Sequence, residues 1–309
     1  MSYLTTLVEK FPVRKSAEQK ERFRQWVVFD QAPALGYQAQ VEENNGYVRN
    51  RNVVIGDPAT AEVLFTAHYD TPATIGLPNI MIPRNLPLFY AYQILLVAGM
   101  LAIAFAAGAL GVAAGLSVDV AYWVGWLCYM ALLFMLMVGI PNPHNVNDNT
   151  SGVAAVLELM KKLPEDVRGK AAFILFDNEE KGLLGSKAYA KAHPEIQYTR
   201  LVVNLDCVGV GETVLVIASK LAASLPAYAK LEDALRNHGG RDVKFFGKSG
   251  SACNSDQKSF KCGVGVVACK KRPVVGYYCA GIHTPKDIAA DQGNIDFLAE
   301  GLAGFMTLL

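Results

Sequence analysis

The sequence of 309 residues shows no charge imbalance and no pairs of closely spaced cysteines, and its first residues do not have the pattern of a leader segment. Lys and Arg total 29 and Asp and Glu total 28, so no basic field exists to attract nucleic acid. The six cysteines contain no C-x-x-C pair, which argues against a zinc ribbon or a thioredoxin-like fold. Free thiols suit a reducing compartment. The N-terminus has no basic segment followed by an apolar core, so we expect no secretory signal.

Charge is also scarce, and the scarcity is concentrated in one region. Only 18% of the residues are charged, and none of them lies within positions 85–118. After the single Asp119, positions 120–143 are again uncharged. Since a helix needs about 20 apolar residues to cross a bilayer, we predict transmembrane helices near Leu86–Leu110 and Val120–Ile140. The alternative is a hydrophobic hairpin buried in an oligomer interface or under a lid.

The flanks of this hairpin predict its orientation. Two spans leave both flanks on the same side of the membrane, and the connecting loop carries only Asp119. Basic residues on the flank side are Lys10, Arg14, Lys15, Lys20, Arg22, Arg24 and Arg84. Because positive residues stay in the cytoplasm, we expect an integral membrane protein with a cytoplasmic globular part, in the plasma membrane if the source is bacterial. The Gly111-x-x-x-Gly115 motif is compatible with a homo-oligomer formed through the hairpin.

Outside the hairpin, strand patterns alternate with helix patterns. Short apolar runs predict buried strands at Glu62–Ala67, Ala171–Phe176, Leu201–Leu205 and Val274–Cys279. Thr150–Leu163 carries apolar residues at helical spacing, which predicts an amphipathic helix. This alternation indicates an α/β fold with a central, mostly parallel but mixed sheet that is flanked by helices.

The hairpin interrupts this alternation, which defines the predicted domains. Residues 1–84 and 141–309 would form a single catalytic domain, and residues 85–140 would be an inserted transmembrane hairpin. Eight positions separate Ile140 from Asp148. An extended chain covers at most about 3.6 Å per residue, so Asp148 should lie within roughly 30 Å of the second span.

Acidic and histidine side chains follow the ends of the predicted strands. They are His68, Asp70, Glu179, Glu180, Asp206 and His283. Asp148 lies in a polar loop that precedes the predicted amphipathic helix. Each residue alone is more often an ordinary surface or loop residue, so the argument depends on their joint occurrence. Because open α/β sheets bind ligands at the carboxyl ends of their strands, we expect these side chains to converge on one edge.

Imidazole nitrogen and carboxylate oxygen are ligands of zinc, and cobalt or manganese can occupy the same kind of site. Two zinc ions would need a bridging carboxylate and about two further ligands each, which His68, Asp148, Glu180, Asp206 and His283 supply. A carboxylate that is not a ligand must accept the proton of the attacking water, and Glu179 fits this role. Asp70 would hold the His68 ring in the correct tautomer.

These motifs resemble peptidase family M28. The segments that carry the resemblance are Ala67-His-Tyr-Asp-Thr71, Asn147-Asp-Asn-Thr-Ser-Gly152, Phe176-Asp-Asn-Glu-Glu180, Asn204-Leu-Asp206, Ser255-Asp256 and Ile282-His-Thr-Pro-Lys-Asp287. The resemblance extends from about Val53 to the end of the chain, apart from the hairpin, which the soluble members lack.

The resemblance assigns a role to each site residue. It implies that Asp148 bridges two metal ions, that Glu180 and His283 complete one site, and that His68 and Asp206 complete the other. It also implies that Glu179 is the general base, that Asp70 orients His68, and that a cis peptide lies beside the bridging Asp148. Gln257 stands where the family often has His, so we expect only a structural role for the Ser255-Asp256 loop.

The predicted function is a membrane-anchored, zinc-dependent exopeptidase, specifically an aminopeptidase that acts on hydrophobic peptides near the bilayer. Its expected partners are a peptide substrate and the lipid bilayer, and no nucleic acid. One alternative on the same fold is a glutaminyl-cyclase-like acyl transfer with one zinc. Another is an amidase or carboxypeptidase, which would need a cation such as Lys270, Lys271 or Arg272 for the substrate carboxylate. A non-enzymatic membrane scaffold should have lost some ligands or the base, and none is lost here.

Overall fold

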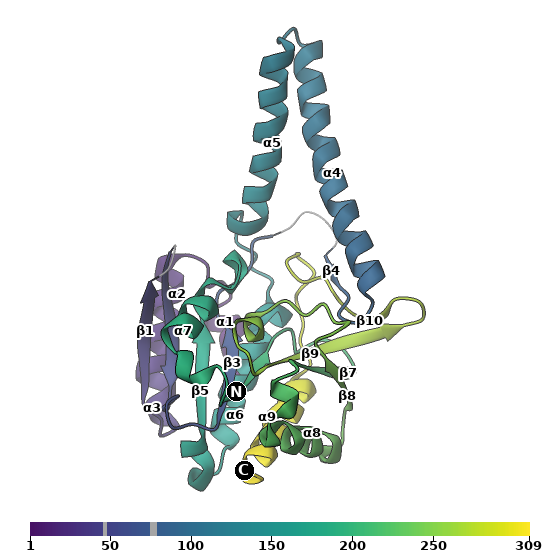
Figure 1. The fold of residues 1–309 in the computed structure, drawn as a ribbon. Coiled ribbons are helices and arrows are strands. Elements are labelled where there is room, and N and C mark those ends of the chain that lie inside the picture. Colours follow the sequence, from purple (N-terminus) through teal and green to yellow (C-terminus); the bar gives the residue numbers. More distant parts are fainter. Residues whose placement is uncertain (46–47, 75–78) are drawn as a thin grey trace.

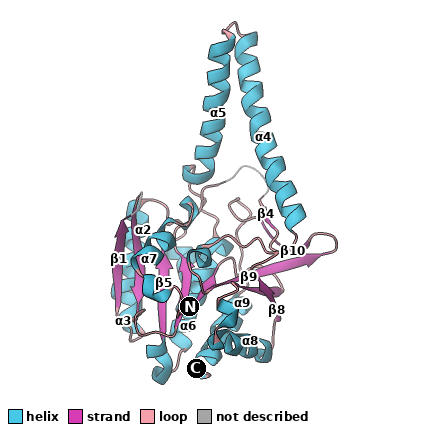
Figure 2. Cartoon of the chain, in the orientation of Figure 1, coloured by secondary structure: helices cyan, strands magenta, loops and turns pink. Residues whose placement is uncertain are grey.

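The computed structural model describes residues 1–45, 48–74 and 79–309 of the chain. A body of sheet and helices carries a long helical hairpin, which projects away from one side of it (Figure 1). Helices pack on the sheet, as the colouring by secondary structure makes plain (Figure 2). The predicted α/β class with a mixed sheet flanked by helices is therefore confirmed.

The sheet has ten strands in the order β1-β2-β5-β3-β6-β9-β10-β4, and β7 and β8 continue from β9. The strands are β1 (Ala39–Asn45), β2 (Arg49–Ile55), β3 (Val63–His68), β4 (Ile80–Met81), β5 (Ala171–Phe176), β6 (Leu201–Leu205), β7 (Thr213–Ala218), β8 (Asp242–Gly247), β9 (Gly263–Arg272) and β10 (Gly276–Ala280). The central strands β5, β3, β6 and β9 are parallel, whereas β1, β2, β10 and β4 pair antiparallel. Because β3, β5 and β6 are buried along their whole length, they read in the sequence as continuous apolar runs.

Helices cover both faces of this sheet. They are α1 (Tyr3–Lys10), α2 (Ala17–Gln25), α3 (Ala32–Ala34), α6 (Gly152–Lys162), α7 (Leu184–Ala192), α8 (Pro226–His238) and α9 (Gln292–Thr307). Side chains alternate across β3, so Phe65 joins the core beneath α6 and α9, while Leu64 joins a second core beneath α7. The predicted helix at Thr150–Leu163 begins two residues later, because the chain bends through the irregular segment Val146–Ser151.

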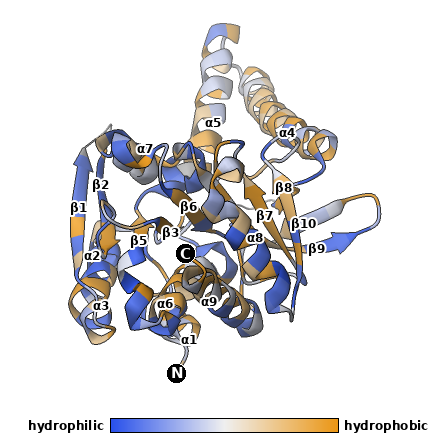
Figure 3. Ribbon diagram, turned by 60° about the horizontal axis from the view of Figure 1, so that its bottom comes forward, coloured by the Kyte–Doolittle hydropathy of each residue, from blue (hydrophilic) through white to orange (hydrophobic). Residues whose placement is uncertain are grey.

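The projecting hairpin consists of α4 (Leu86–Ala113) and α5 (Val118–Val138). By length and composition both helices are candidate membrane spans, and they match the predicted spans to within three residues at each end. Large apolar side chains stand exposed along them, with Phe105 80% and Leu95 71% accessible. Figure 3 shows the hydrophobic colour along most of α4.

Small residues bring the two helices together near their outer ends. Gly108 of α4 faces the backbone of Ala121, and Gly125 of α5 faces that of Ala104. Gly115 has a φ of +90° and lies in the turn between the helices, so it is not part of a helical face. These contacts lie within one chain, and a homo-oligomer formed through the hairpin stays a prediction.

The N-terminal segment packs behind the carboxyl end of β3. Arg14 is 0% exposed, and its guanidinium donates to the carbonyl oxygens of Tyr69 (2.6 Å) and Phe11 (2.7 Å) and to Thr150 Oγ1 (2.9 Å). Lys20 is also buried, with Nζ 2.5 Å from Asp177 Oδ1. Arg14 and Lys20, counted above as positive charge on the membrane flank, are therefore structural residues of the body.

Replacing Arg14 should destabilise the body strongly. Arg14→Met leaves buried acceptors without a donor, and we expect a loss of about 3 kcal/mol in the free energy of unfolding. The control is Arg22→Met, which removes an exposed guanidinium from the same segment and should change stability little. Denaturant unfolding of the two variants, side by side, measures the difference. Equal stabilities would refute the structural role of Arg14.

Candidate metal centre

The five predicted ligands lie together at one edge of the sheet, and the Asp148 carboxylate lies between the two histidines. His68 Nε2 is 3.4 Å from Asp148 Oδ1, and His283 Nε2 is 2.9 Å from Asp148 Oδ2. On the first side, His68 Nε2 also lies 3.6 Å from Asp206 Oδ1. On the second side, His283 Nε2 lies 3.4 Å from Glu180 Oε2. The carboxylate thus divides the set into a half with His68 and Asp206 and a half with His283 and Glu180.

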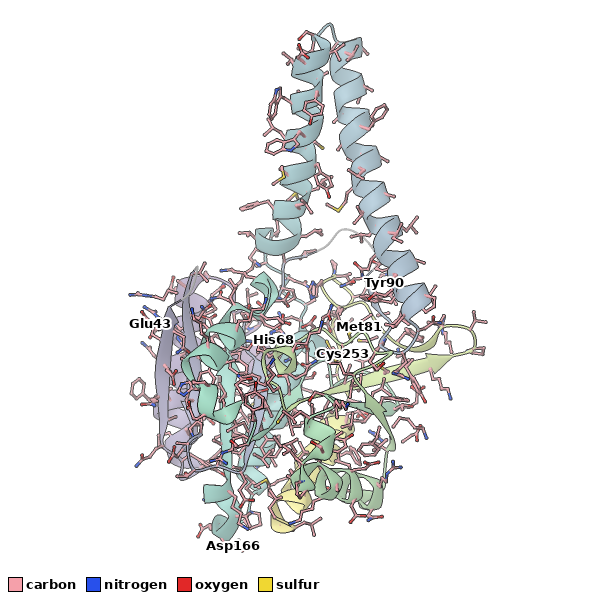
Figure 4. All side chains as sticks on the ribbon, in the orientation of Figure 1. Glu43, His68, Met81, Tyr90, Asp166 and Cys253 are labelled. Atoms are coloured by element: carbon pink, nitrogen blue, oxygen red, sulfur yellow. The ribbon has the colours of Figure 1, made fainter. Side chains whose placement is uncertain are left out.

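The parallel strands explain why these residues meet. His68 is the last residue of β3 and is in register with Phe176, the last residue of β5. Asp206 follows β6 directly, so three strands end at the same edge. Figure 4 labels His68 on the side of the body from which α4 and α5 project. The edge that carries the five predicted ligands and the base of the hairpin therefore lie on the same side.

Left-handed backbone conformations at Asn178 and His283 bring the acidic turn and the His283 side chain to the site. Asn178 has a φ of 54° and turns the chain after β5, so that Glu179 and Glu180 form a tight turn. His283 has a φ of 58° and lies in the loop that follows β10. Asn tolerates this region better than other residues, because its side chain can bond locally. For His283 this conformation is uncommon, which marks the loop as held by its surroundings.

Hydrogen bonds hold the loop that carries Asp148. The Asp287 carboxylate accepts from the backbone N–H groups of Asn147 (2.8 Å) and Asp148 (3.0 Å). Asn149 Nδ2 donates to the Leu205 carbonyl oxygen at the end of β6 (3.0 Å). The Asp148–Asn149 peptide bond is cis, which confirms the expectation from the resemblance. The Asp148 loop is thereby joined to the two loops that carry Asp206 and His283.

Asp70 connects His68 with the acidic turn. Its carboxylate accepts from the backbone N–H groups of Glu179 (3.0 Å) and Glu180 (3.2 Å). His68 Nδ1 lies 3.1 Å from the Asp70 carbonyl oxygen and 3.6 Å from its Oδ1. The backbone carbonyl is thus the nearer partner of the ring, and the carboxylate mainly supports the turn.

Burial and charge together shift the titration of the site. Burial raises the pKa of Glu180 to about 8, and raises the pKa of Glu179 well above its usual range, with nearby carboxylates adding to the shift. Burial opposes the charged form of His283, but Glu180 and Asp148 outweigh it and raise its pKa to about 9. Burial likewise opposes the charged form of His68, and Glu179, Asp148 and the other neighbouring carboxylates raise its pKa well above the usual value. The site is a concentration of negative charge that favours a cation.

The donor atoms fit a metal ion. His68, Asp148 and Glu180 each offer a ligand atom within 4.8 Å of the others, and so do His68, Glu179 and Asp206. Glu180 Oε1 and Asp206 Oδ1 are buried without a hydrogen-bond partner among the described residues. A buried acceptor without a donor is costly, and a bound cation would remove that cost. Imidazole with carboxylate is a donor set of zinc.

Two residues near the site had no predicted role in the chemistry. Asp256 is 0% exposed, both its carboxylate oxygens lack a partner among the described residues, and burial raises its pKa to about 7. Cys207 offers its sulfur within 4.8 Å of ligand atoms of Asp148 and Asp206. Asp256 belongs to the Ser255-Asp256 segment of the resemblance, for which only a structural role was expected, and Cys207 directly follows the predicted ligand Asp206.

The basic triplet 270–272, considered above as a partner for a substrate carboxylate, lies away from this edge. Asp206 N–H donates to the carbonyl oxygen of Val266 in β9. Lys271 is five residues further along this strand, or about 16 Å at 3.3 Å per residue. Lys270, Lys271 and Arg272 are exposed on the part of β9 that projects from the body (Figure 1).

Zinc should stabilise the folded protein, because only the native geometry assembles these ligands. At roughly 100 times its Kd, an ion that binds only the folded state adds about 3 kcal/mol. We expect the melting temperature of chelator-treated protein to rise on zinc addition, and Asp148→Ala to lose most of this rise. Glu165→Ala, at an exposed carboxylate, is the control and should keep it. The same rise in both variants would place the zinc elsewhere.

Comparisons with known proteins agree with this geometry. The model of Peptidase family M28 matches residues 138–306, more than half of the chain. No curated sequence is similar enough to count as a relative.

Among solved structures, a glutaminyl cyclase of Porphyromonas gingivalis is 16% identical with a TM-score of 0.62, and the match covers 99% of this chain and 96% of that one. A Zn-dependent exopeptidase of Parabacteroides distasonis is 16% identical with a TM-score of 0.63, covering 98% and 95%. The LapA aminopeptidase of Legionella pneumophila is 14% identical with a TM-score of 0.57, covering 99% and 68%. At these identities the likeness establishes the fold.

Proposed function

The chain belongs to peptidase family M28, and from this we propose that it is a zinc-dependent exopeptidase, specifically an aminopeptidase, anchored in a membrane by α4 and α5. The observation that carries the proposal is the Asp148 carboxylate between His68 and His283, with one further carboxylate beside each histidine. Such an arrangement provides two adjacent sites that share one bridging ligand.

Two zinc ions are the proposed cofactors. His68 and Asp206 would hold one ion, Glu180 and His283 the other, and Asp148 both. Zinc in such a site polarises the scissile carbonyl and makes a water molecule more acidic. Asp70 and Asp287 keep the ligand loops in place through their bonds to backbone N–H groups.

Glu179 is the proposed general base. One of its carboxylate oxygens lies within 4.8 Å of ligand atoms of His68 and Asp206. Glu179 is therefore within reach of a water molecule on that side of the site. Its pKa is raised by burial and by neighbouring carboxylates, which makes it a better proton acceptor than an exposed Glu. Glu179 would take the proton from the attacking water and pass it to the leaving amine.

Aminopeptidase action fits the charge of the site. Carboxylates dominate it, with Asp148, Glu179, Glu180, Asp206 and Asp256 all contributing, and they favour a substrate that presents an ammonium group. A carboxypeptidase would need a cation for the substrate carboxylate, and the basic triplet 270–272 lies about 16 Å away along β9. The scaffold alternative loses support because the ligands and the base are all assembled.

Glutaminyl cyclisation is the second candidate on this fold. The likeness to the P. gingivalis enzyme over nearly the whole of both chains supports it. The two reactions differ in their products, because a cyclase releases ammonia from N-terminal Gln, whereas an aminopeptidase releases single residues. They also differ in the expected metal content, which elemental analysis of the purified protein measures.

Glu179→Gln should lower the rate of peptide hydrolysis by about 10²–10⁴-fold while the protein stays folded, because loss of a positioned general base costs that much. We would incubate zinc-loaded, detergent-purified protein with a pool of hydrophobic and polar peptides and follow products by mass spectrometry. The control is Glu62→Gln, an exposed carboxylate near the opposite end of β3, which should leave the rate unchanged.

The products decide between the reactions. Stepwise loss of N-terminal residues supports the aminopeptidase, and trimming from the C-terminus or conversion of N-terminal Gln would replace it with another reaction. Full activity in Glu179→Gln would remove Glu179 from the mechanism.

The feet of the hairpin are bonded to the loops that carry the ligands. Thr74 N–H donates to the Ile140 carbonyl oxygen (2.7 Å), and Asn142 N–H donates to that of Pro72 (3.0 Å). Asn142 Nδ2 also donates to the carbonyl oxygen of Thr284, next to His283 (3.0 Å). A membrane that surrounds α4 and α5 would therefore lie close to the site. This closeness supports hydrophobic peptides, which partition to the bilayer surface, as substrates.

Replacing positions 94–134 with a Gly/Ser linker should release the protein from membranes and lower its activity selectively on hydrophobic peptides. The feet stay in place, so the ligand loops keep their bonds and hydrolysis of polar peptides should persist. Flotation in a density gradient and the ratio of the two rates measure these effects. An unchanged ratio would refute the substrate proposal, and flotation of the variant would refute the anchor.

In intact cells, an impermeant thiol reagent should reach Ser117→Cys from outside if the body is cytoplasmic.

A further inference from the structure

Two loops of the body lie at the feet of the hairpin. Asn85, which caps the start of α4, donates from Nδ2 to the carbonyl oxygens of Val274 (3.1 Å) and Val275 (3.3 Å) in the β9–β10 turn. Asn142, just after α5, donates to Thr284 in the loop that carries His283. The β9–β10 turn extends sideways from the body beside the start of α4 (Figure 1). The two residues that bound the hairpin thus each fasten a separate loop beside it.

Both loops expose basic and apolar side chains together. Val274 is 94% exposed at the tip of the first loop, two residues after Arg272, and Lys271 and Arg272 are also exposed. The second loop exposes Lys286 and, 65% accessible, Ile288.

Acidic residues are scarce in the segment of chain that forms the two loops. The sequence has no acidic residue from Gln257 to Lys286. Glu212 accepts the backbone N–H of Lys271, and the buried Asp287 accepts from the Asp148 loop. The exposed charge of both loops is therefore positive, in a chain whose net charge is only +1.

The lengths of the two helices place the start of α4, to which the β9–β10 turn is bonded, outside the hydrocarbon core on the side of the body. Helix α4 has 28 residues and α5 has 21, a difference of seven residues or about 10 Å of helix. Because about 20 residues cross the hydrocarbon core, nearly all of α5 would lie within the core. The first turns of the longer α4 would then lie outside the core, on the side of the body. Phe89, Tyr90 and Tyr92 occupy these turns, as expected for aromatic residues at an interface.

We propose that the β9–β10 turn and the 284–288 loop form a binding surface for anionic phospholipid headgroups. Lys271, Arg272 and Lys286 contact the phosphates, and Val274 enters the interfacial layer. The proposal rests on the membrane anchoring proposed above. Arg14 and Lys20 are buried, so they cannot supply the exposed positive charge that was expected beside the membrane. Lys271, Arg272 and Lys286 supply it instead, and positive charge favours the anionic cytoplasmic leaflet. Since β10 leads directly to His283, the contact also holds that loop at the membrane.

The test places a polarity-sensitive fluorophore on Val274→Cys in the full-length chain. The partly exposed Cys128 and Cys253 are first replaced by Ser, and the other four cysteines are buried. The protein is reconstituted into vesicles of phosphatidylcholine with or without phosphatidylglycerol, and lipids with a quencher near the headgroup are added. We expect a blue shift and strong quenching with phosphatidylglycerol at low salt, and loss of most of both in phosphatidylcholine alone.

Charge neutralisation supplies the matched comparison. Lys271→Gln/Arg272→Gln should lose most of the quenching, whereas Lys161→Gln/Lys170→Gln, which removes the same charge around the far end of the body, should keep it. In labelled Val274→Cys protein that keeps Lys271 and Arg272, high salt should also lower the quenching, because exposed charges are screened. The salt dependence tests the proposal even if the Lys271→Gln/Arg272→Gln variant does not fold.

A label in the middle of α4 separates the two proposals. Ala106→Cys, exposed on α4, should be quenched by labelled acyl chains whatever the headgroup. If Ala106→Cys is not quenched, the membrane anchor itself fails. If it is quenched while Val274→Cys stays solvent-like in both lipids, the anchor stands and the headgroup surface is refuted. Equal quenching of Val274→Cys with and without phosphatidylglycerol also refutes recognition of anionic headgroups.

Discussion

The mutual repulsion of carboxylates at one edge of the sheet is the constraint on which the rest of the structure depends. Asp148, Glu179, Glu180 and Asp206 are held close together in a partly buried space, and Asp256 adds a further buried charge. Such groups separate or take up protons unless cations and fixed donors hold them. The two histidines, backbone N–H groups and, as proposed, two metal ions meet this requirement.

The surrounding body supplies that support in layers. Asp70 and Asp287 are carboxylates that accept backbone N–H groups, so each uses its own charge to fix a loop that carries ligands. Arg14 connects the backbone after His68 to Thr150, which lies in the same irregular segment as Asp148. Lys20 neutralises Asp177 at the end of β5. The N-terminal segment, distant in sequence from every ligand, is thereby a part of the site's foundation.

The hairpin is built into the same region. It leaves the chain between Asp70 and Asp148, and its feet are bonded to the segments that follow Asp70 and His283. An insertion at this place brings the proposed membrane surface to the mouth of the site without a separate linker. Two basic loops at the feet extend the contact from the apolar helices to the polar layer. Membrane anchoring, access of the substrate to the site and preference for the cytoplasmic leaflet would then all depend on the hairpin and the two loops at its feet.

The sequence alone identified the features that depend on local pattern. Continuous apolar runs predicted β3, β5 and β6, uncharged stretches predicted α4 and α5, and the residues after the strands predicted a ligand set that the structure assembles. These succeed because hydrophobic periodicity and length are local properties. The edge strand β8, half exposed and paired only with β7, has no such pattern and escaped prediction.

Only the tertiary structure decided the rest, because burial and pairing depend on residues far apart in the chain. It removed Arg14 and Lys20 from the surface charge and brought Lys271, Arg272 and Lys286 to the feet of the hairpin. It made Asp256 a buried neighbour of the site and gave the Asp70 carboxylate to the turn of Glu179 and Glu180. The sequence determines the chemical type of each residue. The burial, charge interactions and hydrogen bonds of that residue depend on the neighbours that folding places around it.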